Sequence, residues 1–235
     1  MKLRVATYNT LHCSNWKQTI IDFEGIAGVI RTLDADVVGL NEIRGAGPGP
    51  NYDAQTEKLA ELAGYPYYYF APAALFPAGP YGNAVLSRIP FESVEVFPIA
   101  VPEVPKYDGY YEPRCVIKVK LANGVTVMIS HFGLNPDEQE RAVEIVLNNI
   151  DSERTVLMGD FNMEPDAPEL QPLRKLLVDS LSYRNETVLS FPSDEPYCKI
   201  DYIYVTKDVK VREADVPAIV MSDHRPHYAD LTFKD

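Results

Sequence analysis

Cysteine is scarce in this sequence. Its three residues, Cys13, Cys115 and Cys198, are an odd number, lie far apart and form no Cys-x-x-Cys pair. Zinc knuckles and disulfide frameworks depend on cysteines at characteristic short spacings. The sequence therefore excludes both and predicts three free thiols.

Basic residues are also few. Lysine and arginine number 22 against 34 aspartates and glutamates, which gives a net charge of −12 with neutral histidines. A protein that binds duplex nucleic acid needs basic side chains to displace counterions from the phosphates. The composition disfavours tight nucleic-acid binding, although a local basic strip on an acidic protein would still permit it.

Long apolar runs are missing too. No segment approaches the roughly 18 apolar residues that a membrane-spanning helix needs. Residues 1–8 resemble a short strand and lack the apolar stretch and cleavage site of a signal peptide. We expect a cytoplasmic monomer, or a secreted protein if a leader has been removed. Since repeats and low-complexity tracts are also absent, residues 1–235 are expected to form a single domain.

Apolar patterns predict a mixed α/β protein. Near-continuous apolar runs such as residues 125–129 indicate strands covered on both faces. Strands first alternate with helices, then follow one another as hairpins, and then alternate again. This order predicts an α/β sandwich, with two mixed β-sheets packed face to face and helices on the outer faces, rather than a doubly wound parallel sheet. Strands are expected at 3–8, 37–40, 67–70, 84–87, 94–97, 115–121, 125–130, 155–158, 200–205, 209–211 and 228–233, and helices at 16–33, 54–63, 137–150 and 168–177.

Three segments rich in proline and glycine connect these elements, at residues 45–50, 71–80 and 99–113. They are too long for tight turns. Long loops on a rigid scaffold usually carry binding specificity, so these segments are expected to border the functional site.

A polar residue suited to metal or phosphate chemistry follows directly after five short apolar runs, four of which are predicted strands and the fifth of which is residues 219–222. One such ending means little, because strand ends are polar for ordinary reasons. Five together indicate a shared site, since ligands gather at strand ends in layered sheet proteins and converging carboxylates repel one another unless a cation compensates. Oxygen donors without thiolates favour Mg²⁺, Mn²⁺ or Ca²⁺ over zinc. The five endings are Asn9, Asn41-Glu42, His131, Asp160-Phe161-Asn162 and Asp223-His224.

Five motifs make the sequence resemble the endonuclease/exonuclease/phosphatase superfamily, which includes deoxyribonucleases, apurinic-site endonucleases, neutral sphingomyelinases and inositol-polyphosphate phosphatases. The motifs follow the family's order across nearly the whole chain. One departure is that Asn41 stands where glutamine is common, which shortens the side chain by one methylene. The motifs are Leu40-Asn41-Glu42, Gly82–Arg88, Gly159–Asn162, Ile200–Ile203 and Ser222–Pro226.

The resemblance implies a metal site. Glu42 would be the principal carboxylate ligand, with Asn9 beside it, and Asp223 would complete or support the site. Asp160 would either orient the attacking water or bind a second metal ion. One or two Mg²⁺ or Mn²⁺ ions are therefore expected as cofactors.

The resemblance also implies groups around the scissile phosphate. Asn162 would hydrogen-bond the phosphoryl oxygens, Asp201 would orient His224 next to the phosphate, and His131 would flank it from the other side. A phosphodiester repels an anionic nucleophile until a cation neutralises its oxygens, and water must lose a proton as it attacks. An Asp–His hydrogen bond fixes the tautomer and stabilises the imidazolium form.

Several residues keep two interpretations. Arg114 would contact phosphate or brace a carboxylate, or it would form a surface ion pair with Glu112. Asn83 would bind substrate or support the site from behind. His12 would reach substrate or have no role, and His227 is expected at the rim or in the core.

Aromatic side chains at 65–70 are expected to pack in the core and loops rather than to stack on bases.

The expected function is hydrolysis of a phosphodiester or phosphomonoester. Metal-activated water, assisted by the Asp/His groups, would attack a small or lipid-derived substrate. A DNA nuclease of the same superfamily is the first alternative. A catalytically silent domain that binds phosphorylated ligands is the second, disfavoured because every matched position holds a competent residue.

Overall fold

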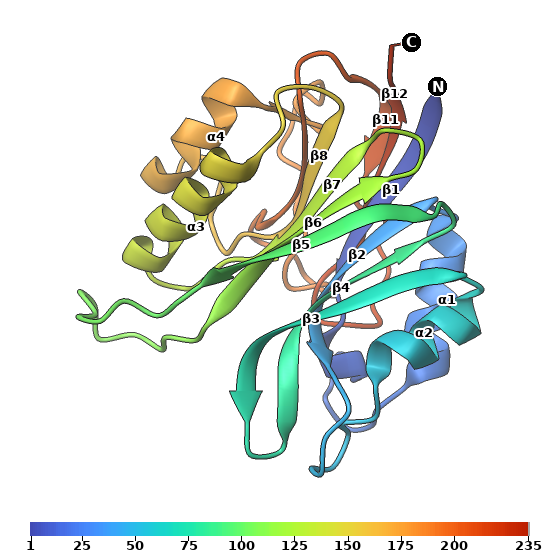
Figure 1. Ribbon diagram of the computed structural model, residues 1–235, viewed down its shortest axis with the longest axis vertical. Coiled ribbons are helices and arrows are strands. Elements are labelled where there is room, and N and C mark those ends of the chain that lie inside the picture. Colours follow the sequence, from blue (N-terminus) through green and yellow to red (C-terminus); the bar gives the residue numbers. More distant parts are fainter. Residues whose placement is uncertain (235) are drawn as a thin grey trace.

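Two six-stranded β-sheets form the centre of the protein, in a computed structural model that describes residues 1–234 (Figure 1). The first sheet has the strand order β11-β12-β1-β2-β4-β3 and the second has the order β5-β6-β7-β8-β10-β9. The strands of the first sheet are β1 (Lys2–Asn9), β2 (Val37–Arg44), β3 (Tyr67–Phe76), β4 (Gly79–Ser87), β11 (Lys210–Asp215) and β12 (His227–Thr232). Those of the second are β5 (Phe91–Ile99), β6 (Arg114–Leu121), β7 (Thr126–His131), β8 (Thr155–Asp160), β9 (Val178–Asp179) and β10 (Asp201–Val205).

The helices cover the outer faces of the two sheets, as Figure 1 shows. Helices α1 (Phe23–Leu33) and α2 (Gln55–Ala63) pack on the first sheet, and α3 (Pro136–Asn149) and α4 (Gln171–Leu176) pack on the second. Two short 3-10 helices, η1 (Leu11–Cys13) and η2 (Pro168–Leu170), complete the set. The predicted α/β sandwich is therefore confirmed.

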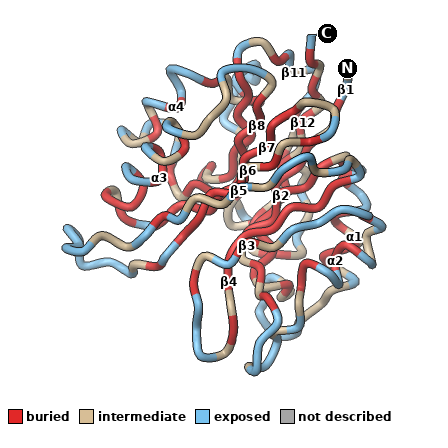
Figure 2. Tube along the Cα trace, in the orientation of Figure 1, coloured by how far each residue is buried: buried red, intermediate tan, exposed pale blue. Residues whose placement is uncertain are grey.

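The main core lies between the sheets. Side chains such as Val5 and Val37 of the first sheet and Ile129 and Met158 of the second are fully buried in it. The sheets approach so closely that a Cβ atom on Gly39 would lie 2.9 Å from Ile129. Figure 2 shows the resulting buried layer along both sheets. This packing fixes the position of one sheet relative to the other.

One edge of the sandwich collects the ends of many strands. Strands β1 and β2 are parallel, and so are β7 and β8, so all four finish at this edge. Strands β10 and β12 run antiparallel to β8 and β1 and begin where those strands finish. Residues far apart in the chain therefore meet at a single edge, which is the arrangement that the polar strand endings predict.

Two predicted boundaries are wrong. The helix expected at 16–33 begins only at Phe23, because the carboxylate of Asp22 accepts a hydrogen bond from the amide of Gly25 at 2.8 Å and caps the helix there. The segment expected as a loop at 71–80 belongs to a long β3–β4 hairpin. Its Pro72 lies where the pairing register shifts, a bulge that tolerates a residue without an amide hydrogen.

The expectation for the aromatic segment 65–70 is also wrong in part. Tyr65 is buried and donates a hydrogen bond to the carbonyl of Ala35 at 2.7 Å. Tyr67, Tyr68 and Tyr69 are exposed, because β3 is the edge strand of its sheet and has no neighbour on one side.

Among residues 1–234, no helix is long and apolar enough to cross a membrane.

His227, the first residue of β12, is a core histidine. It is fully buried, and its Nε2 atom lies 3.1 Å from the hydroxyl of Ser180. Burial, together with the positive charge of Lys199, lowers its pKa to about 4. The unfolded chain therefore binds a proton between about pH 6.5 and pH 4 that the folded chain does not accept.

His227→Gln is predicted to reduce the acid sensitivity of the fold. Because the folded protein does not accept a proton on His227 between about pH 6.5 and pH 4, the unfolded state is favoured by protonation in this range. The stability of the fold that depends on neutral His227 is therefore fully present above pH 6.5 and is lost as the pH falls. Urea unfolding of the wild type and the variant at pH 7 and pH 5 measures the effect. The loss of unfolding free energy over this interval should be about 2 kcal/mol smaller in the variant. Equal losses in the two proteins would contradict the assignment.

Candidate active site

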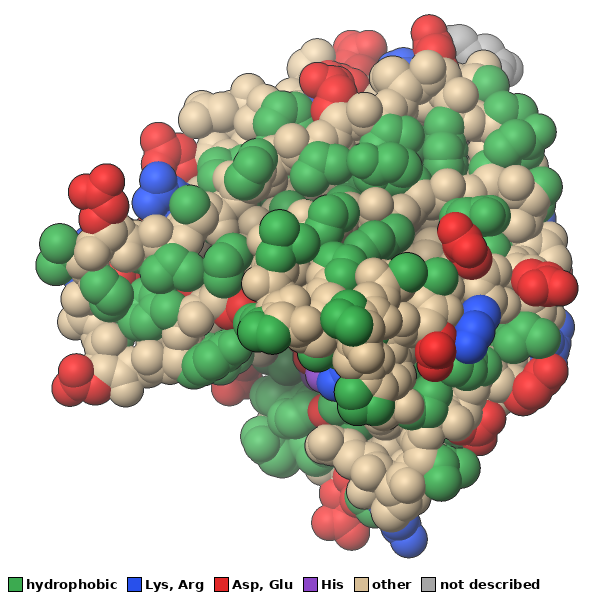
Figure 3. Space-filling model, turned by 60° about the horizontal axis from the view of Figure 1, so that its bottom comes forward, with side chains coloured by type: hydrophobic (Ala, Val, Ile, Leu, Met, Phe, Trp, Pro, Cys, Tyr) green, Lys and Arg blue, Asp and Glu red, His purple; other side chains and the backbone are tan. Residues whose placement is uncertain are grey.

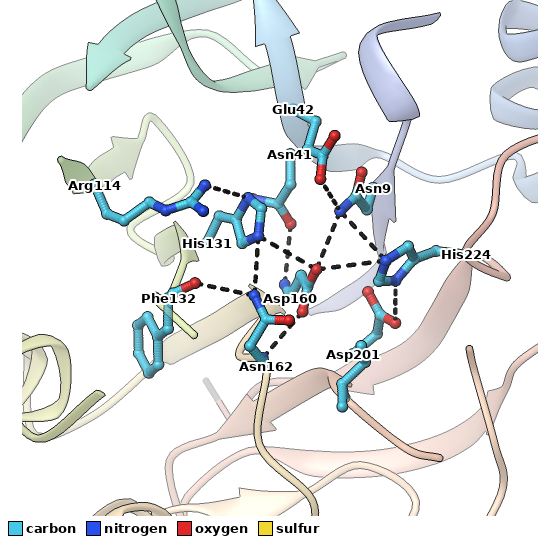
Figure 4. A network of polar contacts seen from close by, with 12 residues as sticks. Asn9, Asn41, Glu42, Arg114, His131, Phe132, Asp160, Asn162, Asp201 and His224 are labelled. Carbon is cyan, nitrogen blue, oxygen red and sulfur yellow. Dashed lines mark hydrogen bonds and ion pairs between the residues drawn. The ribbon is translucent and has the colours of Figure 1, made fainter. Parts of the chain in front are cut away.

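Polar side chains from both sheets meet at the shared edge (Figure 4). The first sheet contributes Asn9 from the end of β1 and Glu42 from β2, and Asp223 and His224 lie just before β12. The second sheet contributes residues from the ends of β7 and β8 and from the start of β10. These are His131, Asp160 and Asp201, with Asn162 two residues beyond β8.

Glu42 reaches the cleft because of a backbone irregularity. The pairing of β2 with β4 shifts register between Leu40 and Ile43, and Glu42 has a φ of 59°. A left-handed conformation costs free energy for any residue with a Cβ atom, and such residues cluster at functional sites. The bulge turns the Glu42 carboxylate toward the amide of Asn9, which donates to it at 3.1 Å.

A glycine brings Asp160 close to His131. These two residues are directly paired across the parallel strands β7 and β8. Gly159 precedes Asp160 with a φ of 147°, and a Cβ atom there would lie 1.8 Å from the carbonyl oxygen of Ser130. Only glycine permits this approach of the two strands.

Asn41 ties the two sheets together beneath the site. Its oxygen accepts a hydrogen bond from the amide of Asp160 at 3.0 Å, and its nitrogen donates to Asn83 at 2.8 Å and to the carbonyl of Ser130 at 3.2 Å. The side chain is fully buried, so each of these bonds forms away from competing water. Asn41, although one methylene shorter than the glutamine common at this position, thus bridges the two sheets. Asn83 supports the site from behind.

Asp201 and His224 form a buried pair. The Nδ1 atom of His224 lies 2.9 Å from a carboxylate oxygen of Asp201. Burial alone would lower the pKa of His224, but the negative charges of Asp201 and Asp160 outweigh it and raise the pKa above its usual value. The imidazole is therefore held as a cation that donates to Asp201 and presents Nε2–H to the cleft.

Asp160 is the most deeply buried carboxylate that faces the cleft. Burial raises its pKa above the usual range, against the opposing effect of the positive charge on His224. Asn9 donates to Asp160 at 3.0 Å, and Asp160 accepts from the amide of Asn162 at 3.0 Å. A carboxylate with a raised pKa can accept a proton near neutral pH.

The tautomer of His131 follows from its neighbour Arg114. A guanidinium can only donate, so His131 Nδ1, at 3.0 Å from Arg114, must accept. Burial, and then the charge of Arg114, holds the pKa of His131 well below its usual value. The ring is therefore neutral, with its proton on Nε2, which points toward a carboxylate oxygen of Asp160 at 3.4 Å. The side-chain nitrogen of Asn162, which lies 3.1 Å from Nε2, is itself a donor and bonds to the carbonyl of Phe132 at 3.0 Å.

Arg114 also pairs with Glu112 at 3.1 Å, with both side chains buried. The ion pair that the sequence suggested is present, but it lies in the wall of the cleft rather than on the surface. Burial opposes the charge of Arg114, and contacts with Tyr81 and Glu112 raise its pKa despite this. Arg114 thus positions His131 and remains charged.

The donor set around Glu42 fits a divalent cation. Glu42 accepts from Asn9 and lies 3.4 Å from His12 Nε2, but burial lowers the pKa of His12 to about 4, so neither neighbour supplies a full positive charge at neutral pH. Burial raises the pKa of Asp223, the positive charge of His224 opposes this rise, and the charge of Glu42 adds to it. Within residues 1–234, neither carboxylate forms an ion pair with a lysine or arginine, and such oxygen donors match the chemistry of Mg²⁺ or Mn²⁺.

Asp160, Asp201 and His224 form a second candidate cluster, since one ligand atom from each lies within 4.8 Å of the others. A metal ion there would have to displace the hydrogen bond between His224 and Asp201. We therefore interpret this trio as a proton-handling group and the Glu42–Asp223 side as the metal-binding side.

The site opens into a cleft with a volume of about 460 Å³. The β3–β4 hairpin and the segment before β6 extend beyond the sheets on either side of it (Figure 1). Figure 3 shows the hollow, with histidine and charged side chains in its floor and hydrophobic side chains along its walls. Phe76 from the hairpin and Tyr110 from the loop before β6 are among the lining residues.

A fold of two mixed sheets, with buried carboxylates, amides and an Asp–His pair at one edge, supplies the groups that phosphoester hydrolysis requires. The sequence profile of the Endonuclease/Exonuclease/phosphatase family matches residues 6–224, and the chain belongs to this family. Members of the family hydrolyse phosphoesters and generally use divalent metal ions, so the chain is a phosphoesterase.

Similar proteins support this placement. The Escherichia coli protein YbhP is 26% identical over 225 residues, covering 86% of this chain and 85% of its own. An endonuclease/exonuclease/phosphatase structure from Beutenbergia cavernae superposes with a TM-score of 0.76 at 25% identity, over 99% of this chain and 72% of that one. A mannosyl-6-phosphatase from Bacteroides thetaiotaomicron shares the fold, with a TM-score of 0.75 at 20% identity, over 98% of this chain and all of the other.

The structure brings the predicted site residues together. Most of them line one cleft, whereas Asn9 and Asp201 are buried beneath it and Asn83 lies behind it. The roles in catalysis and metal binding remain predictions. Sequence reasoning missed the bridging role of Asn41 and the cleft-lining residues Arg44, Tyr52 and Tyr81. Arg44 lies two residues beyond Glu42, and this nearness to a predicted site residue was the available signal.

Asp223→Asn is predicted to stabilise the metal-free protein. Because the pKa of Asp223 is raised in the fold, its ionised form costs stability at pH 7, and a neutral amide removes that cost. The melting temperature in EDTA should rise by about 2–4 °C, while the stabilisation produced by MgCl₂ should shrink. Thermal unfolding with and without MgCl₂ measures both, and the exposed Glu92→Gln serves as a matched control. A lower melting temperature in EDTA, with an unchanged response to MgCl₂, would contradict this assignment.

Proposed function

We propose that this protein, acting as a monomer, hydrolyses a small or lipid-derived phosphoester in a Mg²⁺- or Mn²⁺-dependent reaction. The observation that carries the proposal is the ring of Asn162, His131, His224 and Asp160 around one cleft, beside the carboxylates Glu42 and Asp223. Phosphate-binding donors and a proton acceptor thus lie next to a cation site.

Each group has a separate task. Glu42 and Asp223, with Asn9, would hold the cation, which when bound neutralises charge on the phosphoryl oxygens. The side-chain amide of Asn162 and the Nε2–H groups of His131 and His224 donate to the phosphoryl oxygens, where negative charge develops during attack. For Asn9 to bind metal through its oxygen, its amide must turn over, because that oxygen accepts from the amide of Leu11 at 3.1 Å.

Proton transfer is assigned to Asp160. Its raised pKa suits it to take a proton from the attacking water near neutral pH, and it is held by hydrogen bonds from Asn9 and the amide of Asn162. His224 remains cationic beside it. As charge builds on the phosphoryl group, the protonated Nε2 stabilises that charge.

Size and charge favour a small substrate over nucleic acid. A cleft of about 460 Å³ matches the volume of a pocket for a small molecule. The net charge of −12 opposes the approach of a long polyanion. The mannosyl-6-phosphatase with the same fold makes sugar phosphates a specific class to test.

A substrate panel tests the proposal. Sphingomyelin, glycerophosphodiesters, inositol phosphates and mannose 6-phosphate are compared with plasmid DNA and an abasic-site duplex, each in MgCl₂, in MnCl₂ and in EDTA. We expect turnover of a small or lipid-derived ester that EDTA abolishes. Preference for either DNA substrate would overturn the substrate class, and the absence of metal-stimulated turnover of every ester would overturn the function.

Asp160→Asn is predicted to lower kcat on the preferred substrate by about 100- to 10,000-fold, because it removes the proton acceptor while keeping the side-chain shape. KM should change far less. Steady-state kinetics measure both, with the surface variant Asp215→Asn as the control. A change in KM alone would contradict the role of Asp160.

Asp201→Asn is predicted to shift the pH dependence of activity. The negative charge of Asp201 raises the pKa of His224, so its removal lets the imidazolium lose its proton at lower pH. The basic limb of the kcat/KM profile should therefore move to lower pH by about 1 unit or more. The profile is measured from pH 5 to pH 10 against Asp215→Asn, and an unshifted basic limb would contradict the protonated role of His224.

A further inference from the structure

Arg44 lies at the end of β2 and lines the cleft. Within residues 1–234, its guanidinium group forms no hydrogen bond or ion pair, and its Nε atom is shielded from solvent without a partner. The guanidinium carbon lies 5.2 Å from the ring centroid of Tyr52. A shielded donor without a partner costs free energy, so an unpaired arginine in a cleft calls for an explanation.

The lack of a partner is unexpected in a chain with 34 acidic residues. Other arginines of the described chain pair readily with carboxylates. Arg4 pairs with Asp230, Arg88 with Asp34, and Arg184 with Asp215. Arg44 stands apart from these arginines, because it lines the cleft without a carboxylate partner in the described chain.

The backbone around Arg44 is fixed. Its amide donates to the buried side chain of Gln55 at 2.9 Å, and Gln55 donates in turn to the carbonyl of His12 at 2.8 Å. Arg44 is paired with Tyr81 across β2 and β4, and the rings of Tyr81 and His12 lie 5.3 Å apart. We call Arg44, Tyr52, His12 and Tyr81 the arginine wall.

The arginine wall lies beside the reacting centre. Arg44 is two residues beyond Glu42, about 7 Å along the strand. Both line the same cleft as Asn162 and His224. A small substrate with its phosphoester between Asn162 and His224 could therefore extend past Glu42 to the arginine wall.

We propose that Arg44 binds a second anionic group of the substrate, a carboxylate or a phosphate, on the part that lies outside the reacting phosphoester. A planar guanidinium accommodates either group through two parallel hydrogen bonds. The aromatic rings of Tyr52 and Tyr81 form the walls against which the connecting part of the substrate packs. This inference rests on the proposed hydrolysis of a small phosphoester and narrows its substrate class.

The test uses pairs of substrates that share one phosphoester and differ by one anionic group. Phenyl phosphate is compared with 4-carboxyphenyl phosphate, and a hexose 6-phosphate with the hexose 1,6-bisphosphate; methyl diesters of the phenyl pair are used if the enzyme cleaves only diesters. In the wild type, the added anion should raise kcat/KM by about 10- to 100-fold, mostly through KM. The two pairs distinguish a carboxylate from a phosphate.

Arg44→Gln should reduce this ratio to about 1, and Arg44→Lys should retain part of it because the charge remains without the planar geometry. Arg88→Gln, on a surface ion pair, is the matched control and should keep the wild-type ratio. A wild type without preference for the added anion, or a preference that survives Arg44→Gln, would overturn the proposal.

Binding provides a readout that does not depend on turnover. Isothermal titration in MgCl₂ compares phenylphosphonate with (4-carboxyphenyl)phosphonate, and the carboxylate should tighten Kd about tenfold in the wild type and not in Arg44→Gln. If no ester is hydrolysed while this difference is present, the proposed function fails and the role of Arg44 stands. If esters are hydrolysed and neither readout responds to Arg44→Gln, only the role of Arg44 fails.

Discussion

Carboxylates converge at one edge of the sandwich, largely away from water, and their charge is the constraint on which the rest of the site depends. Each is compensated differently. Asp201 has the imidazolium of His224 at 2.9 Å, and Asp160 has hydrogen bonds from Asn9 and the amide of Asn162. Glu42 and Asp223 have no lysine or arginine partner within residues 1–234. Burial and the charge of Glu42 raise the pKa of Asp223, and the positive charge of His224 opposes that rise. The unequal compensation separates a proton-handling side from a cation-binding side.

These two sides also belong to different sheets, so the geometry of the site depends on how the sheets pack. The residues proposed to bind the cation come from the first sheet, and most of those proposed to bind phosphate come from the second. Two features hold them in register: the close approach of Gly39 to Ile129 and the bridge from Asn41 to the amide of Asp160. Because small displacements of reacting groups cost large factors in rate, the apolar core and the Asn41 bridge belong to the catalytic design as much as the carboxylates do.

The sequence alone predicts the strands and their polar endings well, because local pattern determines both. Apolar runs identify β1, β7 and β8, and the residues that follow them converge as expected. It does not predict the β3–β4 hairpin, since prolines such as Pro72 normally interrupt strands, and here one occupies a bulge. Nor does it place Asn41 or the unpaired guanidinium of Arg44. Their partners, or the lack of them, depend on residues that are distant in the chain and become neighbours only when the sheets pack.

The acidic surface and the arginines in the cleft act over different ranges. At physiological ionic strength, charges are screened over about 8 Å, so a small anion inside the cleft is affected mainly by the groups that line it. These are the cations Arg44, Arg114 and His224, the carboxylates Glu42, Glu112, Asp160 and Asp223, and any cation that the carboxylates bind. A long polyanion extends over the outer surface as well, where the net charge of −12 opposes it. Exposed walls such as Phe76 and Tyr110 narrow the approach further. The proposed preference for compact anionic substrates over nucleic acids therefore rests on two effects: attraction by a bound cation and the basic groups of the cleft, and long-range repulsion by the acidic surface.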